Sequence, residues 1–170
     1  MTIKMIGAIL LVAGCGSIGF LIANAYKHEI NTLREFIYTL ERMKNELQFR
    51  FTPLPKLCRQ ISEGEHGCLG HFYQLLAEEL ESQVRPDAES CVKAALTKSR
   101  NIPLYTQRMV NVLGRTLGRF DLSGQLSELD SLCGECSQKL NALVTDQEKR
   151  IRIYQTLGLC AGVTMAIVLI

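Results

Sequence analysis

The chain has 170 residues, with 19 lysines and arginines against 17 aspartates and glutamates, for a net charge of +2 at pH 7. Because the two signs are mixed throughout and form no concentrated basic stripe, we expect no nucleic-acid partner. The seven cysteines are odd in number and irregularly spaced, which argues against a disulfide framework and fits a reducing compartment.

Two uncharged apolar stretches lie at the ends of the chain, Met5–Tyr26 and Ile153–Ile170, and every charged residue except Lys4 lies between them. At about 1.5 Å per residue, both reach the length needed to cross a hydrocarbon core of about 30 Å, the second only just. We therefore expect transmembrane helices at residues 1–26 and 153–170, with one soluble domain at 27–152.

Basic residues gather on the inner flanks of both stretches, as they do on the cytoplasmic side of membrane helices. They are Lys27, Arg34, Arg42 and Lys44 after the first stretch, and Lys149, Arg150 and Arg152 before the second. Only Lys4 lies on the other side. The domain is therefore predicted to be cytoplasmic, with both termini across the membrane.

The segment Leu11–Cys15 also has the residue types of a bacterial lipoprotein cleavage box. Cleavage there would make the chain a lipid-anchored extracytoplasmic binding protein, with the lipid on Cys15. The sequence after Cys15 stays apolar where a processed lipoprotein usually turns polar, and the start is weakly basic, so the transmembrane interpretation is favoured. The lipoprotein remains the alternative.

Between the stretches, apolar residues recur at threes and fours, which is the helical period, and no convincing β alternation occurs. The domain is predicted to be all-α, with six helices whose approximate extents are Asn31–Phe51, Thr52–Ile61, Leu69–Leu80, Asp87–Leu96, Pro103–Gly118 and from Ser123 onward. Thr52 is expected to cap the second helix with Pro53 at its first position, and Asp87 to cap the fourth.

The first and last helices are predicted to be long and continuous with the two spans. Because both lead into the same membrane, they must run antiparallel. The expected architecture is a helical bundle standing on two transmembrane helices.

Cys133 and Cys136 form a C-x-x-C pair, which can bind zinc or act as a redox pair. A zinc site needs two further ligands, and no second C-x-x-C or paired histidine motif is present. Both sulfurs also fall on the apolar stripe of the last helix, so we interpret them as core residues and expect no metal or cofactor. A zinc or redox sensor is the weaker alternative.

The segment Leu113–Asp121 has glycines four apart, but it lacks the Gly-Lys-Ser/Thr end of a nucleotide loop. We expect a close helix contact at Gly114, a helix stop at Gly118 and a turn cap at Asp121. A contact with a partner protein is compatible with these roles.

The second span contains G-x-x-x-G at Gly158 and Gly162, which could let the two spans pack closely or let two protomers dimerise. No charged residue or histidine lies within either span, which argues against a transporter acting alone. The acidic run Glu78, Glu79 and Glu81 is expected on a solvated helix face. No catalytic constellation is present, so an enzyme is not expected.

The order of these features resembles one family. The quoted residues are the N-terminal span, Leu40-Glu41-Arg42, Glu46, Phe51-Thr52-Pro53-Leu54, the Gly114, Gly118 and Asp121 segment, and the span containing Tyr154-Gln155-Thr156-Leu157-Gly158 and Ala161-Gly162. Together they are similar to the stage III sporulation protein AB family of endospore-forming bacteria. The family typically has an aromatic residue early in the first span, where this chain has Gly14-Cys15-Gly16.

The resemblance implies a non-catalytic platform in the mother-cell membrane around the forespore, as part of a secretion-like channel complex. It also implies a cytoplasmic domain similar to that of type II secretion and type IV pilus platform proteins, which meets a secretion-type ATPase. The candidate contact residues carried over by the resemblance are Thr52, Pro53 and Leu54, with Gly114, Gly118 and Asp121. The expected partners are that ATPase and other membrane components of the complex, while the sequence leaves open whether the chain is a monomer or a homo-oligomer.

Overall fold

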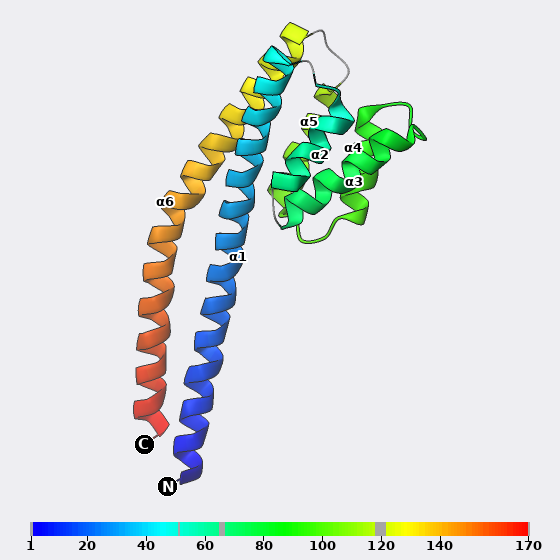
Figure 1. The fold of residues 1–170 in the computed structure, drawn as a ribbon. Helices are drawn as coiled ribbons and strands as arrows, with labels where there is room; N and C mark the ends of the chain where they lie inside the picture. The colour runs from blue at the N-terminus through cyan, green and yellow to red at the C-terminus, as the bar shows by residue number, and fades with distance from the viewer. Residues whose placement is uncertain (1, 51, 65–66, 118–121, 170) are drawn as a thin grey trace. The chain divides into compact units, whose positions relative to one another are not determined.

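The computed structural model describes the backbone at residues 2–50, 52–64, 67–117 and 122–169, and the side chains at 24–50, 52–64, 67–117 and 123–146. Over that backbone the chain forms six helices and no strand (Figure 1). They are α1 (Thr2–Phe49), α2 (Leu54–Gly64), α3 (Cys68–Ser82), α4 (Ala88–Lys98), α5 (Leu104–Thr116) and α6 (Leu122–Leu169). The predicted all-α class and the six helices are confirmed.

The chain divides into two compact units. The terminal unit joins the start of α1, as far as Ile30, to the end of α6, from Asn141. The helical unit comprises Asn31–Leu140 and so holds the rest of α1 and α6 with all of α2 to α5. Each of α1 and α6 is one continuous helix of 48 residues that belongs to both units, which confirms that the long helices continue into the predicted spans.

Over the part of the chain with described side chains, no helix is both long and apolar enough to cross a membrane. The predicted span at 153–170, and the span at 1–26 up to residue 23, lie outside those residues. Both spans, and the Cys15 lipidation site within the first, therefore stay predictions.

The core of the helical unit is built from the apolar stripes that the helical period predicts. Fully or almost fully buried side chains include Leu33, Phe36, Leu40 and Met43 of α1, Leu57, Cys58 and Ile61 of α2, Leu69, Phe72 and Leu76 of α3, Cys91 and Ala95 of α4, Val110 and Leu113 of α5, and Leu129 and Cys136 of α6. Helices α2 to α5 are short, and each packs against the next in the order α2, α3, α4, α5 (Figure 1). Because short helices are marginal alone, this shared apolar core is what keeps them folded.

A buried polar contact joins α1 to α3. The Thr39 hydroxyl donates to the Phe36 carbonyl at 2.8 Å, and the Tyr73 hydroxyl lies 2.9 Å from Thr39 Oγ1. Since the Thr39 proton is used by the carbonyl, Tyr73 is the donor in the second bond. A hydrogen bond inside the core fixes the side-to-side position of the two helices, which apolar packing alone leaves less defined.

Helices α2 and α5 each begin one residue after the proline that was expected to open them. Asp87 caps α4 as predicted, because its side chain accepts a bond from the Ser90 amide at 3.0 Å. Helix α2 begins at Leu54, and its first carbonyl acceptor is Pro53, which receives the Leu57 amide at 3.0 Å. Pro53 therefore stands at the cap and not at the first helical position, and the Thr52 hydroxyl bonds elsewhere.

Candidate functional site

The end of the helical unit where α1 stops and α2 starts carries three of the predicted contact residues. We call the surface of residues 46–50 and 52–54 the turn end. Thr52 donates its hydroxyl proton to Glu46 at 2.8 Å, and the Arg50 guanidinium lies 3.4 Å from the other oxygen of the same carboxylate. Glu46 thus ties the chain after the turn back to the last turn of α1, which explains why Thr52 does not cap α2.

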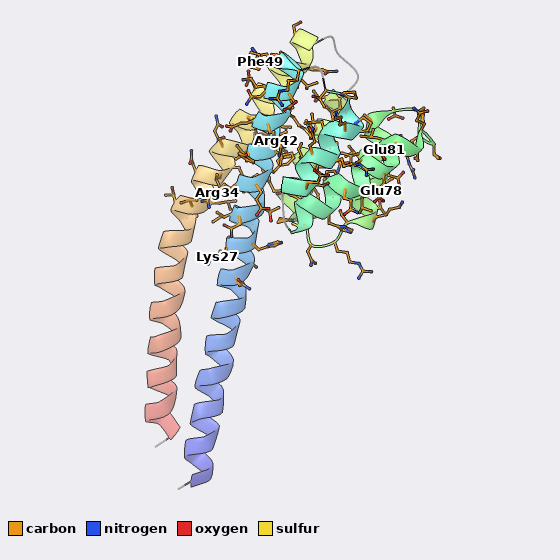
Figure 2. The ribbon with its side chains drawn as sticks, viewed as in Figure 1. Lys27, Arg34, Arg42, Phe49, Glu78 and Glu81 are labelled. Carbon is orange, nitrogen blue, oxygen red and sulfur yellow. The ribbon has the colours of Figure 1, made fainter. Side chains whose placement is uncertain are left out.

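An exposed aromatic side chain lies on this surface. Phe49 is 72% exposed at the last residue of α1 (Figure 2). Pro53 is also exposed, and Leu54 is half-buried. Aromatic and arginine side chains are enriched among residues that dominate protein interfaces, so Phe49 and Arg50 add two contact candidates that sequence reasoning missed. The signal for Phe49 was present in the sequence, because at about 100° per residue it falls on the side of α1 opposite to the apolar stripe.

One surface ion pair joins α1 to α6 beside the turn end. The Lys44 ammonium lies 2.5 Å from the Asp130 carboxylate. The hydrogen bond to Asp130 raises the pKa of Lys44 above its ordinary value. Within the helical unit α1 ends, and α6 begins, on the same side, so the two helices run antiparallel there as predicted (Figure 1).

Gly114 is buried in α5 at a close approach to α4. A Cβ atom at Gly114 would lie 2.9 Å from Cβ of Val92 and 3.1 Å from both of its γ carbons. Any side chain there would push the two helices apart. The prediction of a close helix contact at Gly114 is therefore confirmed, and this buried position serves packing.

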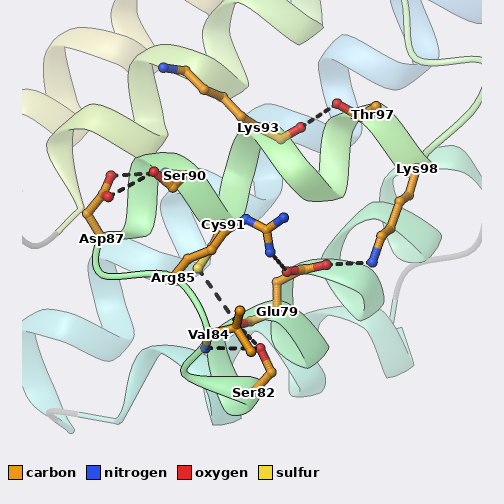
Figure 3. Close-up of polar contacts among 10 residues, drawn as sticks. All are labelled: Glu79, Ser82, Val84, Arg85, Asp87, Ser90, Cys91, Lys93, Thr97 and Lys98. Atoms are coloured by element: carbon orange, nitrogen blue, oxygen red, sulfur yellow. Dashed lines mark hydrogen bonds and ion pairs between the residues drawn. The ribbon is translucent and has the colours of Figure 1, made fainter.

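A cluster around Glu79 contradicts the expectation for the acidic run on α3. Glu79 is only 8% exposed, and its carboxylate receives Lys98 at 2.6 Å and an ion pair from Arg85 (Figure 3). The hydrogen bond from Lys98 holds the pKa of Glu79 below its ordinary value, with a further contribution from the charge of Arg85 and against the opposing effect of burial. Glu79 thus fastens the turn between α3 and α4 onto the end of α4.

The signal for Glu79 was present in the sequence. Its position lies three residues after buried Leu76 and seven after buried Phe72, which is the spacing of the apolar stripe. Glu78 and Glu81, by contrast, are exposed as expected (Figure 2). Glu81 forms an ion pair with Arg59 at 2.5 Å.

The C-x-x-C pair lies on the inner side of α6. Cys136 is buried and Cys133 is half-buried, which confirms the core position for the first and only partly for the second. Burial raises the pKa of Cys136 to about 12 and raises that of Cys133 as well. Among the residues with described side chains, no group of three potential ligands lies close enough to hold a metal ion.

A surface hollow of about 250 Å³ lies between α2 and α3. It is lined by Arg59, Ser62, Glu63, Gln74, Ala77 and Glu78. The Ser62 hydroxyl donates to the Arg59 carbonyl of its own helix at 2.7 Å, so it acts as a local backbone partner. None of the predicted contact residues lines this hollow.

Comparison with known proteins decides the family. A search of curated proteins finds no match. A sequence model described as Stage III sporulation protein AB matches residues 4–170, almost the entire chain. The chain belongs to the stage III sporulation protein AB family.

A solved structure of Stage III sporulation protein AB is similar in fold to this stage III sporulation protein AB family member. The TM-score is 0.65 at 15% sequence identity, over 72% of this chain and 98% of that chain. At so low an identity the likeness shows the shared helical fold and carries no residue roles across.

Within this family member the predicted site residues have different outcomes. Thr52, Pro53 and Leu54 come together at the turn end, and Gly114 lies inside the packing of α4 and α5. Gly118, Asp121, Gly158 and Gly162 lie outside the residues with described side chains. Their roles in helix termination, turn capping, partner contact and membrane packing stay predictions.

Proposed function

We propose that this protein is a non-catalytic membrane platform of a secretion-like channel complex needed for endospore formation. In this proposal its helical unit meets a cytoplasmic secretion-type ATPase and its two predicted spans join the membrane components of the complex. Membership of the stage III sporulation protein AB family supports the role in sporulation.

The observation that carries the coupling role is the continuity of α1 and α6. Each helix runs for 48 residues without a break, from the helical unit into a predicted span. The backbone therefore passes from the helical unit toward each predicted span as helix, with no separate loop segment within the described backbone of α1 and α6.

The basic flanks support a cytoplasmic position for the helical unit, and the mother-cell membrane around the forespore is what the family resemblance implies. Lys27 and Arg34 are exposed on α1 close to the first predicted span (Figure 2). Such residues favour the cytoplasmic side of a membrane because transfer of Lys and Arg across it is disfavoured. The same orientation places the turn end where a soluble ATPase can reach it.

Protease accessibility tests the orientation. Intact protoplasts are treated with external protease, and the helical unit is followed by an antibody, with permeabilised cells as control. Protection in intact cells and cleavage after permeabilisation are expected. Cleavage in intact cells would reject the proposal and favour the lipoprotein anchored at Cys15, which lipid labelling would then show.

Binding tests the partner. The full chain is placed in nanodiscs of neutral phosphatidylcholine, and affinity for the purified ATPase of the same complex is measured with and without nucleotide. Saturable binding is expected, and Asp121→Ala is expected to weaken it while helicity by circular dichroism is unchanged. Absence of binding in both nucleotide states would reject the platform proposal.

A further inference from the structure

One helix of the helical unit exposes apolar and basic side chains on a single face. Leu104 is 73% exposed, Val112 is 38% exposed, and Arg108 and Arg115 are exposed beside them. At about 100° per residue these four positions of α5 fall within an arc of about 80° and along about 17 Å of helix. We call these four residues the α5 face.

The α5 face has only positive charge. Helix α5 contains two arginines and no acidic residue. Arg115 lies 3.3 Å from Glu89 of α4, which shows that a carboxylate can approach this face. Within the described side chains, Arg108 forms no ion pair, so its charge is open to a carboxylate from another molecule.

The opposite side of α5 holds the face rigidly. Thr106, Val110 and Leu113 are buried, and Gly114 brings α5 into close contact with α4. At the start of the helix, the Lys139 ammonium lies 5.3 Å from the ring centroid of Tyr105, which ties α5 to α6. A rigid face loses little conformational entropy when it binds, so an exposed arginine on it is suited to anchor a partner, and an exposed leucine adds apolar area that binding can bury.

We propose that the α5 face, in addition to the turn end, is a docking surface for the cytoplasmic ATPase, and that its occupant is an acidic amphipathic helix of that ATPase. This inference rests on the platform function proposed above. The partner helix would place apolar side chains on Leu104 and Val112 and a carboxylate on Arg108. Charge complementarity carries the assignment, because a partner of like charge would be repelled.

Two other occupants fit the face less well. Basic segments that bind anionic lipid gather four to eight Lys and Arg residues, whereas this narrow face alternates two arginines with apolar side chains. A second copy of the chain offers the acidic side of α3, but Glu79 is buried with its own cations and Glu81 is paired with Arg59. That leaves Glu78 as the main acidic group on that side.

Matched substitutions in the full chain test the proposal in neutral nanodiscs. Arg108→Glu is paired with Arg34→Glu, an exposed arginine of α1 with the same change of charge. Leu104→Ser is paired with Val84→Ser, because Val84 is 78% exposed between α3 and α4. All four positions are at the surface, and circular dichroism checks that each variant keeps its helicity.

The α5 variants should weaken ATPase binding selectively. Arg108→Glu is expected to reduce affinity at least about tenfold, since it places like charges opposite each other. Leu104→Ser should reduce it about fivefold. Both control variants should stay within about twofold, as surface residues outside an interface do. A photo-crosslinker at position 108 should capture an ATPase segment that contains Asp or Glu.

Each other result overturns the inference in a recognisable way. If the unchanged protein binds the ATPase and the α5 variants bind equally well, the α5 face is refuted while the platform function stands. If the unchanged protein does not bind the ATPase at all, both the α5 docking surface and the platform function are refuted. If Arg108→Glu instead abolishes binding to anionic vesicles, or self-association by sedimentation, the occupant is lipid or a second copy.

Discussion

Replacing glycine by alanine should change the free energy of unfolding in opposite directions at two glycines in helix interiors. Replacing Gly114 by alanine adds a Cβ that would lie 2.9 Å from Cβ of Val92, an atom fixed to the α4 backbone. Replacing Gly134 by alanine adds a Cβ with no atom within 4 Å. The comparison isolates the close approach of α4 and α5 from the general effect of removing a glycine.

The size of each change in stability follows from helix propensity, which favours alanine, and from overpacking, which disfavours it. In a helix interior, alanine is more favourable than glycine by about 1 kcal/mol. Overpacking a tight contact costs about 1 to 3 kcal/mol, because helices must shift to accept the added methyl group. Gly134→Ala should therefore stabilise by about 1 kcal/mol, and Gly114→Ala should destabilise by up to about 2 kcal/mol.

The assay is urea unfolding of the full chain in mild detergent, followed by circular dichroism at 222 nm. Because detergent keeps apolar helices folded, the transition reports mainly on the helical unit. A gain in stability for Gly114→Ala equal to that for Gly134→Ala would refute the close contact. Val92→Ala in the Gly114→Ala background, which removes both γ carbons, should recover part of the lost stability.

Two further predictions concern buried groups. The folded-state pKa of Glu79 lies below its ordinary value of 4.5, so its contribution to stability is complete above pH 4.5 and is lost as the pH falls below it. Glu79→Gln should lower the urea midpoint of unfolding at pH 7. The urea midpoint of this variant should also decrease less than that of the unchanged protein as the pH falls from pH 5 to about pH 3. If the variant and the unchanged protein show the same dependence of the urea midpoint on pH, the ion-pair cluster is contradicted. Because burial raises the pKa of Cys136 to about 12, iodoacetamide at pH 8 should label it at least about tenfold more slowly than half-buried Cys133 until urea is added. Equal rates, read by peptide mass mapping, would place Cys136 at the surface.

Sequence reasoning failed where a residue's role depends on a partner across a turn or on another helix. Thr52 preceding a proline is a sound cap by local rules, but Glu46 is close enough in space to take its hydroxyl proton. The position of Glu79 on the apolar stripe of α3 could be read from the sequence, but its two cationic partners, Arg85 and Lys98, are seen only in the folded chain. The folded chain determines which side chains lie close enough to form hydrogen bonds with each other. Local sequence patterns therefore could not predict these partners.

The sequence by itself determined the helical class, the number of helices and most of the buried stripes, because the 3.6-residue period is a local consequence of backbone geometry. It also determined the Asp87 cap, whose partner is only three residues away. Only the tertiary structure decided that Gly114 packs against Val92, which cations pair with Glu79, and which face of α5 is left open. Those properties depend on how helices far apart in sequence pack side by side, and the contacts between them are set by the whole core at once.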